Sequence, residues 1–141
     1  MESSPNHYLF VYGSLLSGFK SPAYEYISRY FDLLTQARVQ GMLYDMGEYP
    51  AAVPVDTHHH IEGELYRIRN VAEFTWAMAQ LDDYEGVLVE HNEAPLYRRE
   101  LVTVSADDSS HTAWIYWFNG DVTGRPVIPS GNLLEYIASQ R

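Results

Sequence analysis

Hydrophobic and polar positions along the chain predict alternating strands and helices. The first apolar run, residues 7–12, is rich in aromatic and β-branched side chains, which is typical of a buried strand that stops at Gly13. Ser21 and Pro22 then form the signature of an N-cap followed by proline at the first helical position. We expect one amphipathic helix through residue 34, because apolar side chains recur at helical spacing at Ala23, Ile27, Tyr30, Phe31 and Leu34.

The middle of the chain predicts two strands. Residues 37–44 alternate at strand period around a central Gly41, which indicates a bulge or a close backbone approach. Residues 45–50 are typical of a turn, and the next strand covers residues 61–68.

The remainder predicts a second helix, two strands and a third helix. Asn70 and Glu73 have the spacing of a capping box, and the helix that they open extends to about Tyr84, with Gly86 as its stop. Strands follow at 96–104 and 112–118 around a hairpin turn at 107–110, and a short helix covers 133–139. This order predicts an α+β domain with an antiparallel or mixed sheet that can close into a small barrel.

Composition narrows the function. A chain of 141 residues predicts one domain, with residues 1–6 as a flexible tail. Its 19 acidic and 9 basic residues give a net charge of -10, which disfavours nucleic acid and anionic membranes as partners. The absence of cysteine excludes disulfides, thiolate metal sites and a cysteine nucleophile. A polar start and the lack of any long apolar run lead us to expect a cytoplasmic protein.

The end of the first strand is a candidate binding loop. A strand that stops at a glycine presents backbone N–H groups without a side chain to block a ligand. We therefore expect Tyr12, Gly13, Ser14 and Leu15 to hold a small molecule that carries a carboxylate.

A carboxylate in the second helix is the candidate acid/base. Helical periodicity carries the apolar stripe from Leu81 to Glu85, four positions later, so Glu85 points inward at the end of the helix. Burial and the negative helix end both favour the neutral acid, so we expect a raised pKa for Glu85. The alternative is an ordinary helix-end glutamate paired with Arg98 or Arg99. Asp82 and Asp83 are expected to be solvated on other faces.

Three further groups of residues have weaker interpretations. Residues 13–21 approach a phosphate-binding loop, but Phe19 separates the glycine and lysine that the motif keeps adjacent. The three histidines at 58–60 suit a solvated turn better than zinc, because only alternate residues of a strand share a face. Glu62 and Glu64 share a strand face, where a glycosidase-type pair is the alternative to solvated or barrel-lining acids.

Seven short motifs then occur in one order over about residues 8–136. They are Val11-Tyr12-Gly13-Ser14-Leu15, Gly41-Met42-Leu43-Tyr44, Gly47-Glu48-Tyr49-Pro50-Ala51, Gly63-Glu64-Leu65-Tyr66, Leu81-Asp82-Asp83-Tyr84-Glu85-Gly86, Tyr97-Arg98-Arg99 and Ile128-Pro129-Ser130-Gly131-Asn132. In these motifs the chain resembles the γ-glutamylcyclotransferase-like superfamily, in its AIG2-like branch. Where relatives often carry Gly-Asp-Trp near the end, this chain has Gly131-Asn132-Leu133.

The resemblance implies a fold and a reaction. The fold would be a small mixed β-barrel flanked by helices, as a single domain over residues 1–141. The reaction would be cyclisation of a γ-glutamyl amine or peptide to 5-oxoproline and a free amine, without cofactor or metal. Glu85 would act as the general acid/base, Tyr12 to Leu15 would hold the substrate, and Tyr97 would line the pocket. The alternative is a binding module that holds a small carboxylate or amino-acid-like ligand without turnover.

Overall fold

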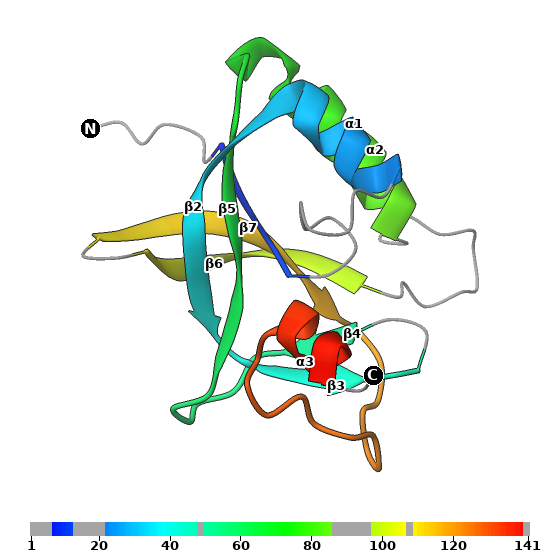
Figure 1. Cartoon of the computed structure of the whole chain (residues 1–141). Helices are drawn as coiled ribbons and strands as arrows, with labels where there is room; N and C mark the ends of the chain where they lie inside the picture. Colours follow the sequence, from blue (N-terminus) through cyan, green and yellow to red (C-terminus); the bar gives the residue numbers. More distant parts are fainter. Residues whose placement is uncertain (1–6, 13–21, 48–49, 86–96, 107–108, 140–141) are drawn as a thin grey trace.

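A computed structural model describes residues 7–12, 22–47, 50–85, 97–106 and 109–139 (Figure 1). The strands are β1 (Tyr8–Val11), β2 (Phe31–Gln40), β3 (Met42–Asp45), β4 (Pro50–Val53), β5 (His60–Ile68), β6 (Tyr97–Ala106) and β7 (Ser109–Phe118). The helices are α1 (Pro22–Tyr30), the 3-10 turn η2 (Val71–Glu73), α2 (Phe74–Glu85) and α3 (Leu133–Ser139). These elements form the α+β architecture that the sequence predicts.

Five strands close into a barrel in the order β1-β5-β2-β6-β7. Most neighbours are antiparallel, but β1 pairs with β7 in parallel through Leu9 and Trp114, so the barrel is mixed. β6 and β7 form a long hairpin that stays in register from Tyr97–Phe118 to Ala106–Ser109. β3 and β4 form a separate two-stranded sheet. The predicted mixed barrel flanked by helices is therefore confirmed.

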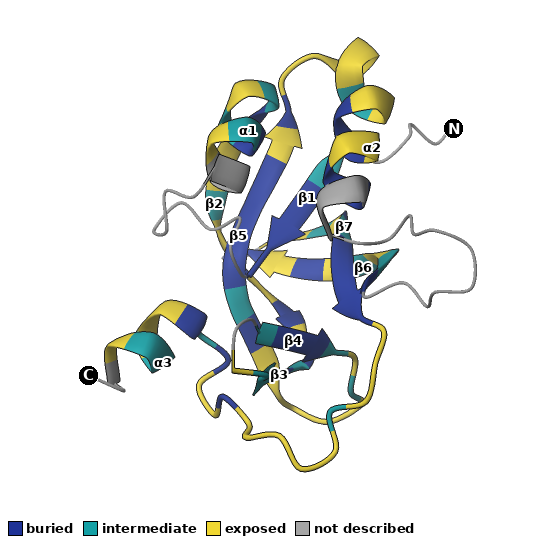
Figure 2. Ribbon diagram, turned by 90° about the vertical axis from the view of Figure 1, so that its right-hand side faces the viewer, coloured by how far each residue is buried: buried dark blue, intermediate teal, exposed yellow. Residues whose placement is uncertain are grey.

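Alternation along the strands divides the buried side chains between two faces. The barrel interior takes side chains from all five barrel strands and from Tyr12, which directly follows β1. They include Phe10, Val39, Leu65, Val104 and Ile115. The second group, here the helix-side cluster, lies between the outer face of the barrel and α1 and α2. Its members include Leu9, Val11, Ile27, Tyr66, Met78, Leu81, Tyr97, Tyr116 and Phe118. Figure 2 shows buried residues along β1, β5 and β7 where these two layers meet.

The start of α2 follows the predicted cap. The side chain of Asn70 accepts a hydrogen bond from the backbone N–H of Ala72 at 3.1 Å, and η2 leads directly into α2. Asn70 thereby satisfies one of the backbone donors that a helix start leaves unpaired. α2 ends at Glu85, and Gly86, the predicted stop, lies outside the described residues.

The first helix is shorter than its apolar periodicity predicts. α1 ends at Tyr30 and β2 begins at Phe31, so the expected extension through Leu34 is wrong. β2 pairs with β5 from Phe31 onward, and Leu33 and Leu34 are 45% and 41% exposed. Strand pairing with β5 outweighs the helical pattern here. The sequence does not predict this pairing, because the partner strand is distant in the chain and leaves no local signal.

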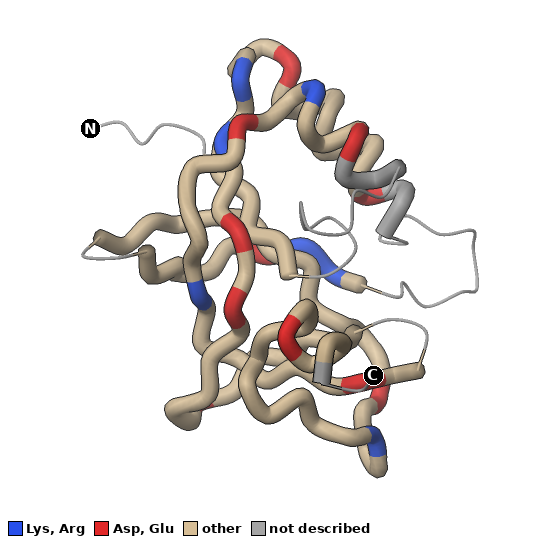
Figure 3. The backbone as a smooth tube through the Cα atoms, in the orientation of Figure 1, with Lys and Arg blue, Asp and Glu red and all other residues tan. Residues whose placement is uncertain are grey.

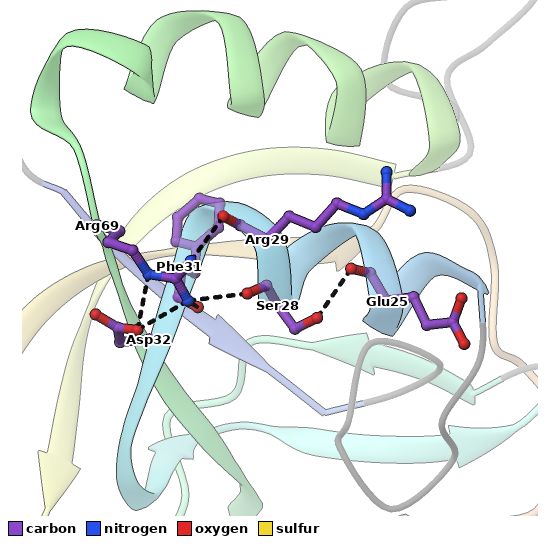
Figure 4. Close-up of polar contacts among 6 residues, drawn as sticks. All are labelled: Glu25, Ser28, Arg29, Phe31, Asp32 and Arg69. Carbon is purple, nitrogen blue, oxygen red and sulfur yellow. Dashed lines mark hydrogen bonds and ion pairs between the residues drawn. The ribbon is translucent and has the colours of Figure 1, made fainter.

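Arg69 holds the junction between α1 and β2 (Figure 4). Its guanidinium donates hydrogen bonds at 2.9 Å to the carbonyls of Ser28 and Arg29, and its Nε donates to Asp32 at 3.0 Å. The backbone N–H of Arg69 donates to the Tyr30 carbonyl at 2.7 Å. Arg69 thus places a positive charge and several donors at the negative end of α1.

Gly41 separates β2 from β3 and divides the single strand that the sequence predicts over residues 37–44. A Cβ at Gly41 would lie 2.8 Å from a methyl of Ile61 and 3.0 Å from the Val53 carbonyl, as expected for a close backbone approach. β4, which pairs with β3, was not predicted, because four residues that include Pro50 and two alanines carry little strand signal.

Acidic positions are spread over the helices, the barrel and the β3–β4 end in the described part of the chain (Figure 3). None of the described helices combines the length and apolar character needed to cross a membrane.

Candidate active site

The two segments predicted to form the site lie partly outside the described residues. Gly13, Ser14 and Leu15 fall outside them, and so does the side chain of Glu85. The structure does place the strand that leads into the loop, the helix backbone up to Glu85, and Tyr97 at the start of β6.

An ion pair joins the last turn of α2 to the start of β6. Nε and Nη2 of Arg99 donate to the two oxygens of Asp82 at 2.7 and 3.0 Å. The hydroxyl of Tyr116 donates to the same carboxylate at 2.9 Å. Asp82 precedes Glu85 by one helical turn, and Arg99 follows Tyr97 on the same face of its strand. The structure thus brings the helix end that carries Glu85 to the strand that carries Tyr97.

The expectation that Asp82 is solvated is wrong, since it is only 6% exposed. Asp82 lies four positions after Met78 and three before Glu85, so it belongs to the same inward stripe. This helical spacing is the sequence signal that could have placed Asp82 inward. The strand that begins at Tyr97 carries its partner, Arg99. Of the two arginines considered as partners for Glu85, Arg99 pairs with the buried Asp82 and Arg98 pairs with Glu100.

Tyr97 and Tyr12 lie on opposite faces of the barrel wall. Tyr97 belongs to the helix-side cluster, packs edge-on against Phe118 with 5.8 Å between ring centroids, and donates its hydroxyl to the Pro50 carbonyl at 3.0 Å. Tyr12 belongs to the barrel interior, and its hydroxyl donates to the Tyr116 carbonyl. The Tyr12 ring therefore faces away from the helix-side cluster to which Tyr97 belongs.

Glu64 is the second buried carboxylate of the described residues, at 4% exposed. Its strand position is opposite Val11 at the end of β1, and the hydroxyl of Tyr66 donates to its Oε1 at 2.9 Å. Tyr66 belongs to the helix-side cluster, so Glu64 lines the barrel face that α1 and α2 cover. Glu62, on the same strand face, is only partly buried, and the histidines at 58–60 are exposed.

Aromatic side chains fill the contact between α1 and α2. The rings of Tyr26 and Tyr30 lie 6.4 and 5.4 Å from the ring of Trp76, measured between centroids, and the Tyr26 hydroxyl donates to the Ala77 carbonyl at 3.3 Å. Burial, reinforced by the neighbouring Tyr30, raises the pKa of Tyr26 to about 12. The two helices therefore support each other above the helix-side cluster.

A polar groove lies away from these residues, on β2, β5 and β6. It is lined by Gln36, Ala37, Arg38, Glu62 and Ser105. Of the predicted site residues whose side chains the structure describes, neither Tyr12 nor Tyr97 borders this groove. In the described ranges, no cluster of three or more His, Asp or Glu side chains is arranged to hold a metal ion.

Sequence comparison identifies the family of this fold. Residues 9–135 match the family described as gamma-glutamyl cyclotransferase, AIG2-like. The chain belongs to this family. The gamma-glutamylcyclotransferase family protein ytfP of Citrobacter rodentium is 31% identical over 127 residues, which cover 90% of this chain and 95% of that protein. Family membership supports an enzyme of the γ-glutamyl cyclotransferase type that acts on small γ-glutamyl substrates.

Solved structures share the architecture of this family member. The solution structure of ytfP from Escherichia coli has a TM-score of 0.62 at 28% identity, with 91% of this chain and 96% of that chain covered. An AIG2-like protein from Mus musculus has a TM-score of 0.65 at 20% identity, covering 88% and 86%. YkqA from Bacillus subtilis has a TM-score of 0.69 at 24% identity. That match covers 97% of this chain but 44% of YkqA, so the chain spans less than half of that protein.

Proposed function

We propose that this chain cyclises a γ-glutamyl amine or γ-glutamyl peptide to 5-oxoproline and releases the free amine, with Glu85 as general acid/base. The ion pair between Asp82 and Arg99 is the observation that carries the proposal, because it brings the end of α2 to the strand of Tyr97. Family membership supplies the reaction class.

The reaction needs orientation and proton transfer more than a protein nucleophile. The substrate's own α-amine attacks its γ-carbonyl carbon, the new C–N bond closes a five-membered ring, and the bond to the leaving amine breaks. Oriented intramolecular attack reaches effective molarities of about 10⁵–10⁸ M, so holding the folded substrate supplies much of the acceleration.

Glu85 would carry the proton between the two nitrogens. An α-ammonium with a pKa near ~7.8 and an ordinary glutamate near ~4.3 differ by roughly 3.5 units, or about 4.8 kcal/mol. A carboxyl tuned to about 6–7 lowers that cost to roughly 1–2.5 kcal/mol. The carboxyl that accepts the amine proton can then return it to the leaving nitrogen. Backbone N–H groups beyond Tyr12 would bind the substrate carboxylate or polarise the amide oxygen.

The test replaces the carboxyl of Glu85 with an amide. Glu85→Gln keeps the size of the side chain but cannot take a proton, so 5-oxoproline release should fall by about 10²–10⁴-fold. Release from γ-glutamyl amines and γ-glutamyl dipeptides is measured by mass spectrometry, with circular dichroism to confirm folding. Glu73→Gln is the matched control, because it makes the same charge change at the exposed start of α2 and should keep wild-type activity.

Two outcomes would contradict the proposal. Full activity of Glu85→Gln would remove Glu85 from the mechanism. Binding of γ-glutamyl compounds by the wild-type chain without any 5-oxoproline would instead support the binding module.

A further inference from the structure

We propose that Asp82 is a positioning residue for the reaction: clamped by Arg99 and Tyr116, it fixes the rotation of the last turn of α2 and so the direction of Glu85. This inference rests on the proposed function. The clamp is defined here as Asp82, Arg99, Tyr116 and Trp114.

The clamp has a geometry that fixes both distance and rotation. Two parallel hydrogen bonds of 2.7 and 3.0 Å join the guanidinium of Arg99 to the carboxylate of Asp82. The Asp82 side chain is 9% exposed and that of Arg99 is 24% exposed, so water competes little for these bonds. Bidentate pairs of this kind have a strict planar geometry, and buried pairs are weak evidence for stability. We therefore assign the pair to orientation.

Asp82 is a support and not itself the base, because both of its oxygens are engaged. Oδ1 accepts hydrogen bonds from Arg99 and Tyr116, and Oδ2 accepts the second bond from Arg99. Because donors from Arg99 and Tyr116 already occupy both oxygens, this carboxylate holds the helix turn in place and is not available to accept a proton from a substrate.

The barrel side of the clamp is rigid. Arg99 and Tyr116 are directly paired across the β6–β7 hairpin, which stays in register over its full length. The guanidinium carbon of Arg99 also lies 4.5 Å from the centre of the Trp114 ring, which adds a cation–π contact to the same side chain. Tyr97 is on the same hairpin face two residues earlier, so the clamp and the predicted pocket wall share one scaffold.

The helix side needs such a clamp, because its apolar contacts are poor at fixing rotation. α2 packs on the barrel through Ala77, Met78 and Leu81, whose contacts are non-directional, and methionine adapts easily to a shifted neighbour. The hydrogen bond from Tyr26 to the Ala77 carbonyl is directional, but it lies about two turns before Glu85. A side-chain tip lies roughly 5–6 Å from a helix axis, so a rotation of about 20° would move the Glu85 carboxyl by roughly 2 Å. A misplacement of about 1 Å can cost on the order of 100-fold in rate.

Two variants test the clamp. Asp82→Asn keeps the shape but removes the charge that Arg99 needs, and Arg99→Lys keeps the charge but removes the planar fork. We expect kcat for 5-oxoproline release to fall at least ten-fold in each folded variant, with KM changed less than three-fold. Amide hydrogen exchange in the last turn of α2 should accelerate at least ten-fold. Arg99→Lys carries the test if Asp82→Asn does not fold.

Asp32→Asn is the matched control, since it breaks another Asp–Arg pair, with Arg69, which lies at the end of α1 and just before the start of α2, at the opposite end of α2 from Glu85. It should leave kcat and the amide exchange of the last turn of α2 at wild-type values. A kcat within two-fold of wild type in folded Asp82→Asn or Arg99→Lys would overturn the inference and leave the proposed function standing. If the wild-type chain makes no 5-oxoproline, the proposed function fails. In that case, unchanged amide exchange in the last turn of α2 in Asp82→Asn and Arg99→Lys would also refute the clamp. Accelerated exchange in these variants would support the claim that the clamp fixes the last turn of α2.

Discussion

Gly131 is the position where a single methyl group should harm the fold most visibly. Its φ is +69°, and a Cβ built there would lie 1.9 Å from the carbonyl oxygen of His60. The segment is fixed in place, because the N–H of Glu62 donates to the Gly131 carbonyl at 2.7 Å. Gly131→Ala therefore adds both backbone strain and a clash with β5.

The expected cost follows from those two contributions. A left-handed conformation costs a residue with a Cβ about 1–2 kcal/mol. Relieving the clash requires the backbones to separate by about 1 Å or more, and overpacking of this kind costs about 1–3 kcal/mol. Loss of the hydrogen bond to Glu62 adds about 0.5–1.5 kcal/mol. We expect Gly131→Ala to lower the free energy of unfolding by about 2.5–6.5 kcal/mol.

Gly124 offers a matched control within the same chain. Its φ is +79°, but a Cβ there would meet nothing within 4 Å. Gly124→Ala should therefore lose only the strain of about 1–2 kcal/mol. Urea denaturation followed by tryptophan fluorescence would measure both variants against wild type. Equal losses for the two variants would refute the reasoning, because the close approach of residue 131 to β5 would then cost nothing.

Two predictions concern α1. Arg69→Ala removes the hydrogen bonds to the carbonyls of Ser28 and Arg29, and it should lower the free energy of unfolding by about 1–2 kcal/mol and leave kcat unchanged. The loss stays modest because water can reach the freed carbonyls. A thermal melt measures it, and a loss below about 0.3 kcal/mol, the error of that measurement, would contradict the role of Arg69 as a cap. Tyr26→Phe should remove a tyrosinate absorbance step near pH 12 from the titration curve of the wild-type chain. If the substitution instead removes part of the step near pH 10, the burial of Tyr26 is contradicted. Because folding raises this pKa, the contribution of Tyr26 to stability is complete below pH 10 and is lost as the pH rises toward 12.

Local patterns predicted the elements whose signals lie within a few residues. The first strand, the Asn70 cap, the β6–β7 hairpin and the last helix all appear where the sequence places them. Each rests on periodicity or on a side chain that bonds its own neighbours. Periodicity alone did not decide between an open sheet and a barrel. The resemblance of the motifs to the family predicted the closed barrel.

Features that depend on distant partners were missed or misplaced. β2 begins at Phe31 because Ile68 lies opposite, and β4 exists because β3 pairs with it. Asp82 is buried because Arg99 and Tyr116 reach it from another part of the chain. Of the candidate site, the relation between the end of α2 and Tyr97 is now structural, whereas the roles of Glu85 and of residues 12–15 stay predictions.

The parallel pairing of β1 with β7 has a consequence for how activity arises during folding. The hydroxyl of Tyr12 bonds the carbonyl of Tyr116, 104 positions later, so the barrel closes across almost its whole sequence. Such non-local contacts form late and slow folding. While β7 is still inside the ribosome, the nascent chain has no closed barrel, and Tyr116 cannot yet bind Asp82. Substrate should therefore be turned over only after the last strand has joined the first.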